Sequence, residues 1–348
     1  MGTGTGWSVR VHYHRAPMAA TRERVFSGVQ PTGIPHLGNL LGAFRHWVSD
    51  QETHECLYCV VDLHSITVPY EPAQLRDASL GMATLLMAVG VDPERSILFV
   101  QSHVREHTEL AWILNCTATF GEVSRMTQFK EKSAGQESVS VGLFDYPVLQ
   151  AADVLLYNAH RVPVGDDQRQ HLELMRDIAV RFNGRYGETF VVPQASIPRV
   201  GARIMDLQAP TNKMSKSGGT ELGTIWLSDP PARLKKKIMG AVTDSGAEVR
   251  ADASKPGVTA LLQILAAVTD TSVSALQDQY AGSQYGAFKK DVLDATVAFL
   301  EPIQARHAEL VDDPGEVLRG LRASADRARE IAVSTMTSVR EAVGLLLS

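Results

Sequence analysis

The sequence is poor in cysteine and has no long hydrophobic run. Three cysteines among 348 residues cannot form a disulfide framework. Cys56 and Cys59 make a C-x-x-C pair inside the apolar run 56–61, which favours packing in a buried strand over redox or zinc chemistry. No apolar stretch reaches the roughly 18 to 20 residues that cross a bilayer. With no hydrophobic run typical of a signal peptide, these absences predict a cytoplasmic protein without a membrane segment.

A basic excess is also lacking. The net charge of -5 argues against a globally basic nucleic-acid binder, although a local basic surface could still hold an RNA backbone. The length exceeds the size at which one core usually stops growing, so we expect about two domains. Residues 1–17 are rich in Gly and Thr and have no periodic apolar pattern, and we interpret 1–21 as a flexible extension.

Strand and helix patterns alternate over the first half of the chain. Strand-like runs at 24–29, 57–61 and 97–100 are separated by helical spacing after residue 37 and after residue 74. Such alternation favours a parallel sheet with right-handed crossovers, whose ligand site lies beyond the carboxyl ends of the strands.

The pattern becomes mainly helical between residues 105 and 156, resumes its alternation at 162–164, and is helical after about 229. The predicted fold class is therefore α/β: a Rossmann-like parallel sheet with a helical insertion, followed by an all-helical C-terminal domain. The predicted division is an extension at 1–21, a sheet domain at 22–228 with its insertion near 105–160, and a helical domain at 229–348.

The first motif that indicates chemistry is Pro35-His36-Leu37-Gly38-Asn39, where a strand gives way to a helix. A helix N-terminus offers free N–H groups and partial positive charge, and Gly38 permits close approach of a backbone to phosphate. His36 and Asn39 could donate to phosphate or ribose oxygens. The alternative is that His36 caps the helix and Gly38 serves packing.

The second motif is Lys213-Met214-Ser215-Lys216-Ser217, between Pro210 and a Gly-Gly pair. Two lysines on a loop can close over a triphosphate and stabilise the charge that grows on leaving pyrophosphate. The alternative is an ordinary solvated loop.

Together the two motifs resemble the paired signatures of class I aminoacyl-tRNA synthetases, and the finer match is to the bacterial-type tryptophanyl branch. The supporting segments are 26–33, 126–133, 151–157, 201–205, 242–245 and 255–257. The resemblance implies ATP-dependent formation of tryptophanyl-adenylate and transfer of tryptophan to tRNA(Trp). It also implies Mg²⁺ carried by the nucleotide, no structural metal, a homodimer, and a helical anticodon-binding domain.

Selection of tryptophan is expected to depend on Asp153. Helical spacing places Tyr146, Gln150, Asp153 and Tyr157 on one face, and Asp153 lies among apolar neighbours. A buried carboxylate needs a donor, which an indole N–H would supply and phenylalanine would not. On this hypothesis phenylalanine leaves the carboxylate unpaired. The alternative is that Asp153 makes a structural cap or ion pair.

The resemblance implies further site residues. Those expected at tryptophan, with Asp153, are Phe26, His64, Gln128, Tyr146, Val162, Val164 and Gln168. Those expected at ATP are Gln30, Pro31, Thr32, His36, Gly38, Asn39, Gly165, Asp166, Asp167, Ile204, Lys213, Met214, Ser215, Lys216 and Ser217. Lys132, Lys213, Lys216 and Asn39 are expected to assist catalysis, which needs no protein nucleophile because the tryptophan carboxylate attacks the α-phosphorus.

Other functions stay open at this point. The stretch His103-Val104-Arg105-Glu106-His107 fits a pattern of some zinc peptidases, but we favour surface or helix-start histidines there. A small-molecule nucleotidyltransferase could share the first motif but would lack the second. A tyrosyl-type synthetase and a catalytically silent, synthetase-like RNA-binding protein are the nearer alternatives.

Basic residues of the helical domain are candidates for holding the anticodon stem, with ordinary solvated helix faces as the alternative. They are Lys235, Lys236, Lys237, Arg319, Arg322, Arg327 and Arg329.

Overall fold

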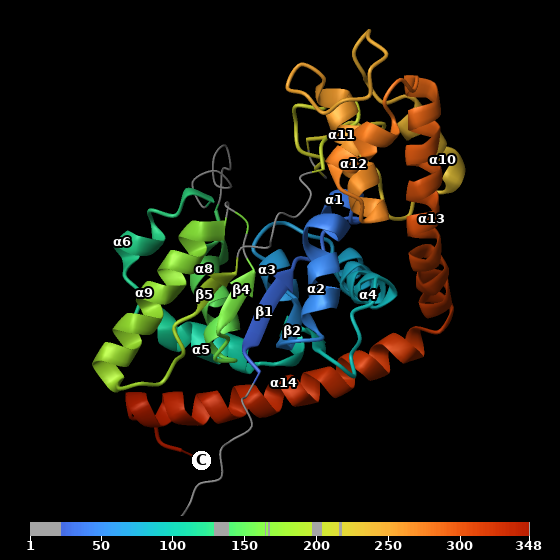
Figure 1. The fold of residues 1–348 in the computed structure, drawn as a ribbon. Helices are drawn as coiled ribbons and strands as arrows, with labels where there is room; N and C mark the ends of the chain where they lie inside the picture. Colours follow the sequence, from blue (N-terminus) through green and yellow to red (C-terminus); the bar gives the residue numbers. More distant parts are fainter. Residues whose placement is uncertain are drawn as a thin grey trace, which may run out of the picture.

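The computed structural model describes residues 22–128, 139–163, 165, 168–196, 204–215 and 218–347. Five strands there form a parallel sheet in the order β3-β2-β1-β4-β5 (Figure 1). The strands are Arg24–Val29 (β1), Glu55–Val60 (β2), Ile97–Val100 (β3), Arg161–Pro163 (β4) and Gln194–Ser196 (β5). The chain runs outward from β1 in both directions, so a topological switch point lies between β1 and β4.

Helices connect and cover the strands. Those of the sheet region are α1 Leu37–Asn39, α2 Arg45–Asp50, α3 Asp62–Ser65, α4 Pro72–Ala88, α5 Glu106–Asn115, α6 Phe120–Val123, α8 Val141–Leu155 and α9 Arg169–Tyr186. A π-helical turn, Leu40–Phe44, joins α1 to α2. Those that follow are α10 Pro231–Met239, α11 Pro256–Thr269, α12 Val273–Gln279, α13 Tyr285–Asp312 and α14 Pro314–Val343. The expected alternation, the helical insertion after β3 and the helical C-terminal region are confirmed.

Strand β2 is buried on both faces. Cys56 and Tyr58 belong to the core beneath α2 and α4, whereas Leu57 and Cys59 belong to the core beneath α5, α8 and α9. Alternating side chains of a strand point to opposite faces, so the two cysteines lie on opposite sides of the sheet. Burial raises the pKa of the Cys56 thiol to about 11 and that of Cys59 as well. The packing interpretation of this pair fits, because thiols so placed share no metal and form no disulfide.

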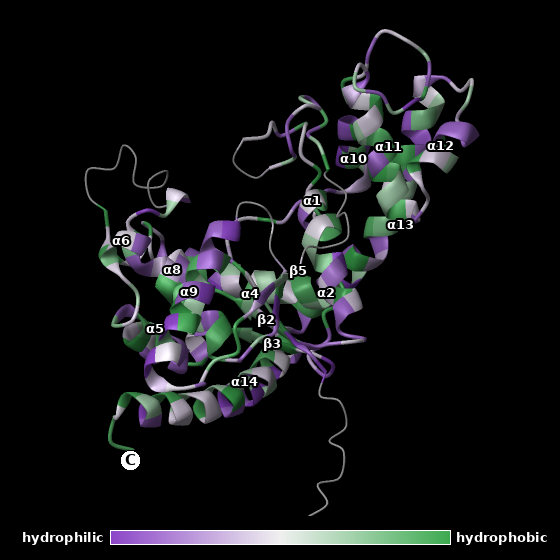
Figure 2. Cartoon of the chain, turned by 60° about the vertical axis from the view of Figure 1, so that its left-hand side comes forward, coloured by the Kyte–Doolittle hydropathy of each residue, from purple (hydrophilic) through white to green (hydrophobic). Residues whose placement is uncertain are grey.

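The last helix leaves the helical region and returns to the sheet. Helices α10 to α13 stand together at one end of the molecule, whereas α14 runs beneath the sheet (Figure 1). Its inner side contributes Ala325, Ala328, Ala332 and Met336 to the core shared with α5, α8 and α9. Hydrophobic and hydrophilic colours alternate along α14, as in an amphipathic helix (Figure 2). The predicted division at residue 229 stays a prediction, and α14 ties the regions on either side of it together.

Two details bear on the sequence predictions. Strand β5 has no apolar pattern and was not predicted. Within the described ranges, no single helix is long and apolar enough to span a membrane; α11 with α12 passes by length and composition but is bent by 108°.

Candidate active site

A cavity of about 550 Å³ opens at the switch point of the sheet. Strands β1 and β4 form one side, with α8 and the start of α9 around it. Its walls contain seven of the residues expected at tryptophan: Phe26, His64, Gln128, Tyr146, Asp153, Val162 and Gln168. Gln30 and Gln150 line it too. The sheet thus brings together residues that are up to 142 positions apart in the chain (26 to 168).

Asp153 lies buried in the wall of this cavity, 2% exposed. Its Oδ1 accepts hydrogen bonds from Nε2 of Gln101 at 2.6 Å and Nδ1 of His107 at 2.7 Å. Its Oδ2 accepts one from Nε2 of His64 at 2.8 Å. Burial alone would raise the pKa of Asp153, but the hydrogen bonds and charges of His107 and His64 hold it below its usual range. The carboxylate is therefore ionised.

This geometry corrects one step of the specificity hypothesis. Asp153 already has three donors, so a ligand without an N–H does not leave it unpaired. Each carboxylate oxygen can accept about two hydrogen bonds, and Oδ2 receives one from the protein. An indole N–H would thus add a hydrogen bond to the network instead of rescuing a bare charge.

Two residues of this network, Gln101 and His107, were missing from the sequence prediction. Gln101 directly follows β3, and its Oε1 accepts the Leu63 N–H at 3.1 Å. His107 is fully buried on α5, and its Nε2 lies 2.7 Å from the Tyr157 hydroxyl. The expectation of surface or helix-start histidines thus holds: His107 lies in the first turn of α5, although it is buried, and His103 is exposed. A polar residue at the carboxyl end of a strand was the signal that could have identified Gln101.

Other polar groups line the cavity as well. The Tyr146 hydroxyl donates to Oε1 of Gln128 at 3.3 Å and lies 3.0 Å from Nε2 of His171. Gln150 Nε2 donates to Oε1 of Gln168 at 3.3 Å. These amides and hydroxyls can meet an ammonium and a carboxylate, while Phe26, stacked on Tyr157 at 5.7 Å, supplies an aromatic floor. The cavity thus suits a large aromatic amino acid.

The first motif, residues 35–39, and the second motif, residues 213–217, are here called the first and second signatures. The first signature forms the N-terminus of the helix after β1. Oδ1 of Asn39 accepts the backbone N–H of His36 at 3.0 Å, which leaves the Asn39 amide NH₂ as the donor. A Cβ on Gly38 would lie 3.0 Å from the His36 ring and 3.6 Å from Cβ of Ile204. A side chain at position 38 would therefore crowd the His36 ring, whereas its contact with Ile204 would be an ordinary van der Waals contact.

The second signature leaves the protein core at Met214, which is 1% exposed. The Met214 N–H donates to Ile204 O at 3.0 Å, and Met205 pairs with Lys213 in an antiparallel bridge. Ser215 Oγ accepts the Gly218 N–H at 3.1 Å. Buried Met214 therefore holds the second signature to the core, and Lys213 beside it is exposed.

Comparisons with known proteins agree with this geometry. The family model "tRNA synthetases class I (W and Y)" matches residues 18–301. The chain belongs to this family. It is 51% identical over 326 residues to a tryptophan–tRNA ligase of Caldanaerobacter subterraneus, covering 93% of this chain and 99% of that protein. It is 53% identical over 333 residues to tryptophan–tRNA ligase 2 of Streptomyces avermitilis, covering 94% and 99%.

A solved structure of the family is similar throughout. It is the tryptophanyl-tRNA synthetase of Campylobacter jejuni, complexed with ADP and tryptophan, with a TM-score of 0.82 and 35% identity. The match covers 92% of this chain and all of that one. A parallel sheet with a helical C-terminal region is therefore the fold of this synthetase-family member.

Several expected site residues of this synthetase lie outside the described residues. They are Lys132, Val164, Asp166, Asp167, Lys216 and Ser217, together with the extension at 1–21. Gly165 is exposed, and its carbonyl accepts the Gln168 N–H at 3.0 Å just before α9. Pro31 is buried and Thr32 is exposed beyond the end of β1. The roles of all these residues stay predictions.

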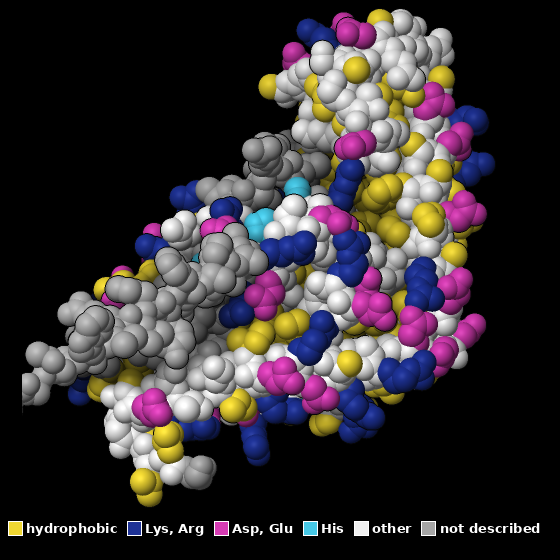
Figure 3. Space-filling view, turned by 60° about the horizontal axis from the view of Figure 1, so that its bottom comes forward, with side chains coloured by type: hydrophobic (Ala, Val, Ile, Leu, Met, Phe, Trp, Pro, Cys, Tyr) yellow, Lys and Arg dark blue, Asp and Glu magenta, His cyan; other side chains and the backbone are white. Residues whose placement is uncertain are grey.

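Three of the basic residues proposed to hold RNA have hydrogen-bond partners within the protein. Lys237 is fully buried and donates to Thr224 O and Asp229. Arg327 donates to the Ser96 carbonyl at 2.7 Å, and Arg329 donates to that of His103 at 2.7 Å. Lys and Arg are interspersed with Asp and Glu on the face shown in Figure 3. The exposed candidates are Lys235, Lys236, Arg319 and Arg322.

A zinc peptidase site is not found in the described part of the chain. His107 is committed to Asp153 and Tyr157, and no group of three or more metal-binding side chains gathers among those residues.

Proposed function

We propose that this chain is a tryptophan–tRNA ligase, which uses ATP to make tryptophanyl-adenylate and then transfers tryptophan to tRNA(Trp). The observation that carries the proposal is the cavity at the switch point, which presents an ionised, buried Asp153 to an aromatic ligand. The indole N–H would donate to Oδ2 of Asp153, which His64 already holds in place. The 51% identical relative over 93% of the chain has the same activity in its name.

The chemistry needs no protein nucleophile. A tryptophan carboxylate oxygen attacks the α-phosphorus of ATP, the new C–O–P linkage forms, and the bond to pyrophosphate breaks with its electron pair on the leaving group. Gln128, Tyr146 and Gln168 would orient the amino acid, since these three polar residues line the cavity. Holding the two reactants in line is the largest contribution of the protein.

Positive charge must meet the growing negative charge on pyrophosphate. Lys213 stands beside the buried anchor Met214, and Lys132 and Lys216 are proposed to join it. Asn39 would donate its free amide to the nucleotide. Mg²⁺ carried by ATP would neutralise phosphate oxygens. Replacing Lys213 with Ala is expected to slow adenylate formation far more than it weakens tryptophan binding, which stopped-flow fluorescence and equilibrium titration separate.

The test is amino-acid-dependent exchange of labelled pyrophosphate into ATP, measured with each of the twenty amino acids. Exchange with tryptophan alone supports the proposal. Exchange with tyrosine instead supports the tyrosyl-type alternative. No exchange by folded protein contradicts the enzyme and favours a silent RNA-binding relative. Charging of tRNA(Trp), followed by acid gel separation, then tests the transfer step in what we take to be a cytoplasmic reaction.

We also propose a homodimer that is formed through the helical insertion. Trp112 on α5, Phe120 on α6 and Val141 on α8 are 72%, 77% and 80% exposed. Phe120 contacts the Phe144 ring of α8 at 5.3 Å, and α5 packs on α8, so these side chains belong to one group of helices. Large apolar side chains exposed on one group of helices are typical of protein interfaces. Sedimentation at micromolar concentration should give a dimer, and Phe120→Ser should shift it toward monomer.

A further inference from the structure

Residues 224–229, here called the bridging segment, contact both ATP signatures. The Leu37 N–H donates to Ile225 O at 2.8 Å, and the Leu227 N–H donates to Pro35 O at 3.2 Å. These two hydrogen bonds form an antiparallel bridge with the first signature. Toward the second signature, Thr224 Oγ1 donates to Ser215 O at 3.4 Å. A displacement of this segment would therefore move the signatures relative to each other.

Two side chains of the helical region hold the bridging segment. Lys237 of α10 donates from Nζ to Thr224 O at 2.7 Å and to the Asp229 carboxylate. Gln304 of α13 donates from Nε2 to Leu227 O at 2.8 Å and to Asp229 O at 3.0 Å. Asp229 Oδ2 also accepts the Trp226 N–H at 2.8 Å, which closes the segment on itself. The side chains of Lys237 and Gln304 thus donate to four acceptors of the bridging segment: three backbone carbonyl groups and the Asp229 carboxylate.

The space beside the segment is not filled. A cavity of about 580 Å³ lies there, with Gly33, Ile34 and Pro35 on one side and Leu227 and Gln304 on another. Because this cavity lies beside the first signature, fewer packed side chains fix the position of that signature. Directed hydrogen bonds therefore carry more of that task at this place than they do in a packed core.

We propose that Gln304 and Lys237 are positioning residues, which fix the bridging segment and through it the affinity of the first signature for ATP. This inference rests on the proposed function, because it assumes that the first signature binds ATP. Among the residues that line the cavity expected to hold tryptophan, none belongs to the bridging segment. The effect is therefore specific: ATP binding depends on Gln304, and tryptophan binding does not.

Gln304 is the better residue to change, because it is half-buried and uncharged. Gln304→Ala removes both hydrogen bonds of Gln304. Gln304→Glu keeps the length of the side chain but places a carboxylate against the two carbonyl oxygens. In pyrophosphate exchange we expect KM for ATP to rise roughly 10-fold in Gln304→Ala and further in Gln304→Glu, with KM for tryptophan within about 2-fold. Gln304→Lys restores N–H donors and should recover part of the ATP affinity.

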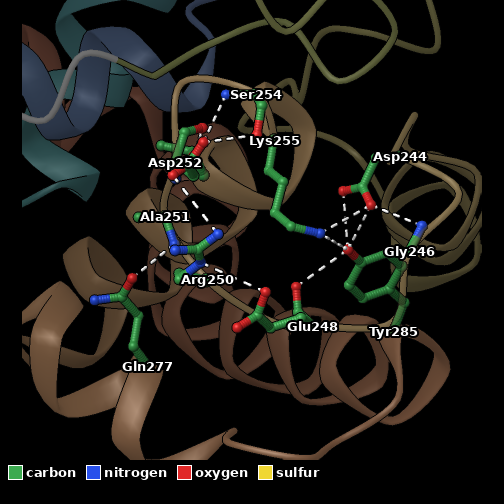
Figure 4. Close-up of polar contacts among 11 residues, drawn as sticks. Asp244, Gly246, Glu248, Arg250, Ala251, Asp252, Ser254, Lys255, Gln277 and Tyr285 are labelled. Atoms are coloured by element: carbon green, nitrogen blue, oxygen red, sulfur yellow. Dashed lines mark hydrogen bonds and ion pairs between the residues drawn. The ribbon is translucent and has the colours of Figure 1, made fainter.

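Gln277→Ala is the matched control. Gln277 also belongs to the helical region and makes a backbone hydrogen bond, in which its Oε1 accepts the Ala251 N–H at 2.7 Å (Figure 4). It has no contact with the bridging segment among its described hydrogen bonds, so its KM for ATP should stay within about 2-fold. Thermal unfolding checks that every variant is folded.

The inference is overturned if Gln304→Ala and Gln304→Glu leave KM for ATP unchanged, if both KM values rise equally, or if Gln277→Ala has the same effect. Should Gln304→Ala and Gln304→Glu fail to fold, Gln304→Lys decides in the same assay against Gln304→Met, which keeps the length and lacks the donor. Equal KM values for ATP in that pair contradict the role. Absence of tryptophan-dependent exchange in the unchanged protein would contradict the proposed function instead.

Discussion

Two buried carboxylates of this molecule have opposite surroundings. Asp153 and Asp229 are each 2% exposed. Asp229 is neutralised by the ammonium group of buried Lys237, whereas Asp153 is held by two imidazoles and an amide and faces a cavity. The Asp229–Lys237 ion pair has a structural role, because its two charges neutralise each other within the protein. The Asp153 carboxylate keeps acceptor capacity for a ligand. Burial alone therefore does not identify a binding carboxylate. The distinguishing feature is an oxygen that lies at a cavity and can accept a further hydrogen bond.

The largest effect should come from breaking the structural pair. Lys237→Met removes the buried cation of Asp229 and leaves only the exposed Arg233, whose Nε lies 3.7 Å from Oδ1, so we expect a loss of about 3 kcal/mol of unfolding free energy. Urea denaturation measures it. Lys236→Met, at the exposed neighbour, should change this free energy by less than about 0.5 kcal/mol. Equal stability of the two variants would show that Asp229 and Lys237 do not form the pair described.

The binding carboxylate should lose activity instead. Asp153→Asn keeps the size of the side chain but removes the charge that the indole N–H would meet. A charge-assisted hydrogen bond contributes about 1.5–3 kcal/mol, so kcat/KM for tryptophan in pyrophosphate exchange should fall roughly 10- to 150-fold. KM for ATP should change by less than about 2-fold. An unchanged kcat/KM would remove Asp153 from the binding site.

A smaller effect should follow from changing a partner of Asp153. His107→Phe removes a hydrogen bond that lowers the pKa of the carboxyl, so kcat/KM for tryptophan should fall roughly 2- to 12-fold at neutral pH. The pKa of Asp153 then rises. Protonation removes the negative charge that strengthens the hydrogen bond to the indole N–H, so tryptophan binding should weaken at a higher pH than in the unchanged protein. Exchange rates between pH 4 and 8 measure this shift, and His103→Phe, at the exposed histidine of the same stretch, should show none.

A third carboxylate sharpens the comparison at the surface. Asp244 accepts hydrogen bonds from Lys255 and Tyr285 (Figure 4). Burial opposes ionisation, but these bonds and the Gly246 N–H lower the pKa of Asp244 to about 2. Its contribution to stability is therefore present above the unfolded pKa of about 3.9 and is lost as pH falls toward 2. Asp244→Asn should lower Tm at pH 7, and the difference should vanish near pH 2, unlike that of exposed Asp278→Asn, which should be small throughout.

Much of the fold could be predicted because its strands are apolar and its helices periodic. The strands at 24–29 and 97–100 have the bounds predicted from sequence. Strand β5 could not be predicted, since Gln194, Ala195 and Ser196 show no buried face. The course of α14 could not be predicted either. An amphipathic stripe shows that a helix packs, but it does not show against which core.

The site was predictable where resemblance supplied residues, and less so where it depended on contacts between them. Seven residues expected at tryptophan do surround one cavity. Two of the three donors to Asp153 were missed, because Gln101 and His107 come from other elements, 52 and 46 residues away in sequence, and no motif of the family resemblance marks them. Their absence from the sequence argument is why the cost of an unpaired carboxylate was overestimated.

The most direct test of the account compares tryptophan with an analogue in which sulfur replaces the indole N–H, β-(benzothiophen-3-yl)alanine. The ratio of their kcat/KM values in pyrophosphate exchange is measured for the unchanged protein and for Asp153→Ala. We predict a preference for tryptophan of roughly 10- to 150-fold in the unchanged protein that falls to within a few-fold in Asp153→Ala. The same ratio in both proteins would contradict the claim that Asp153 accepts a hydrogen bond from the indole N–H.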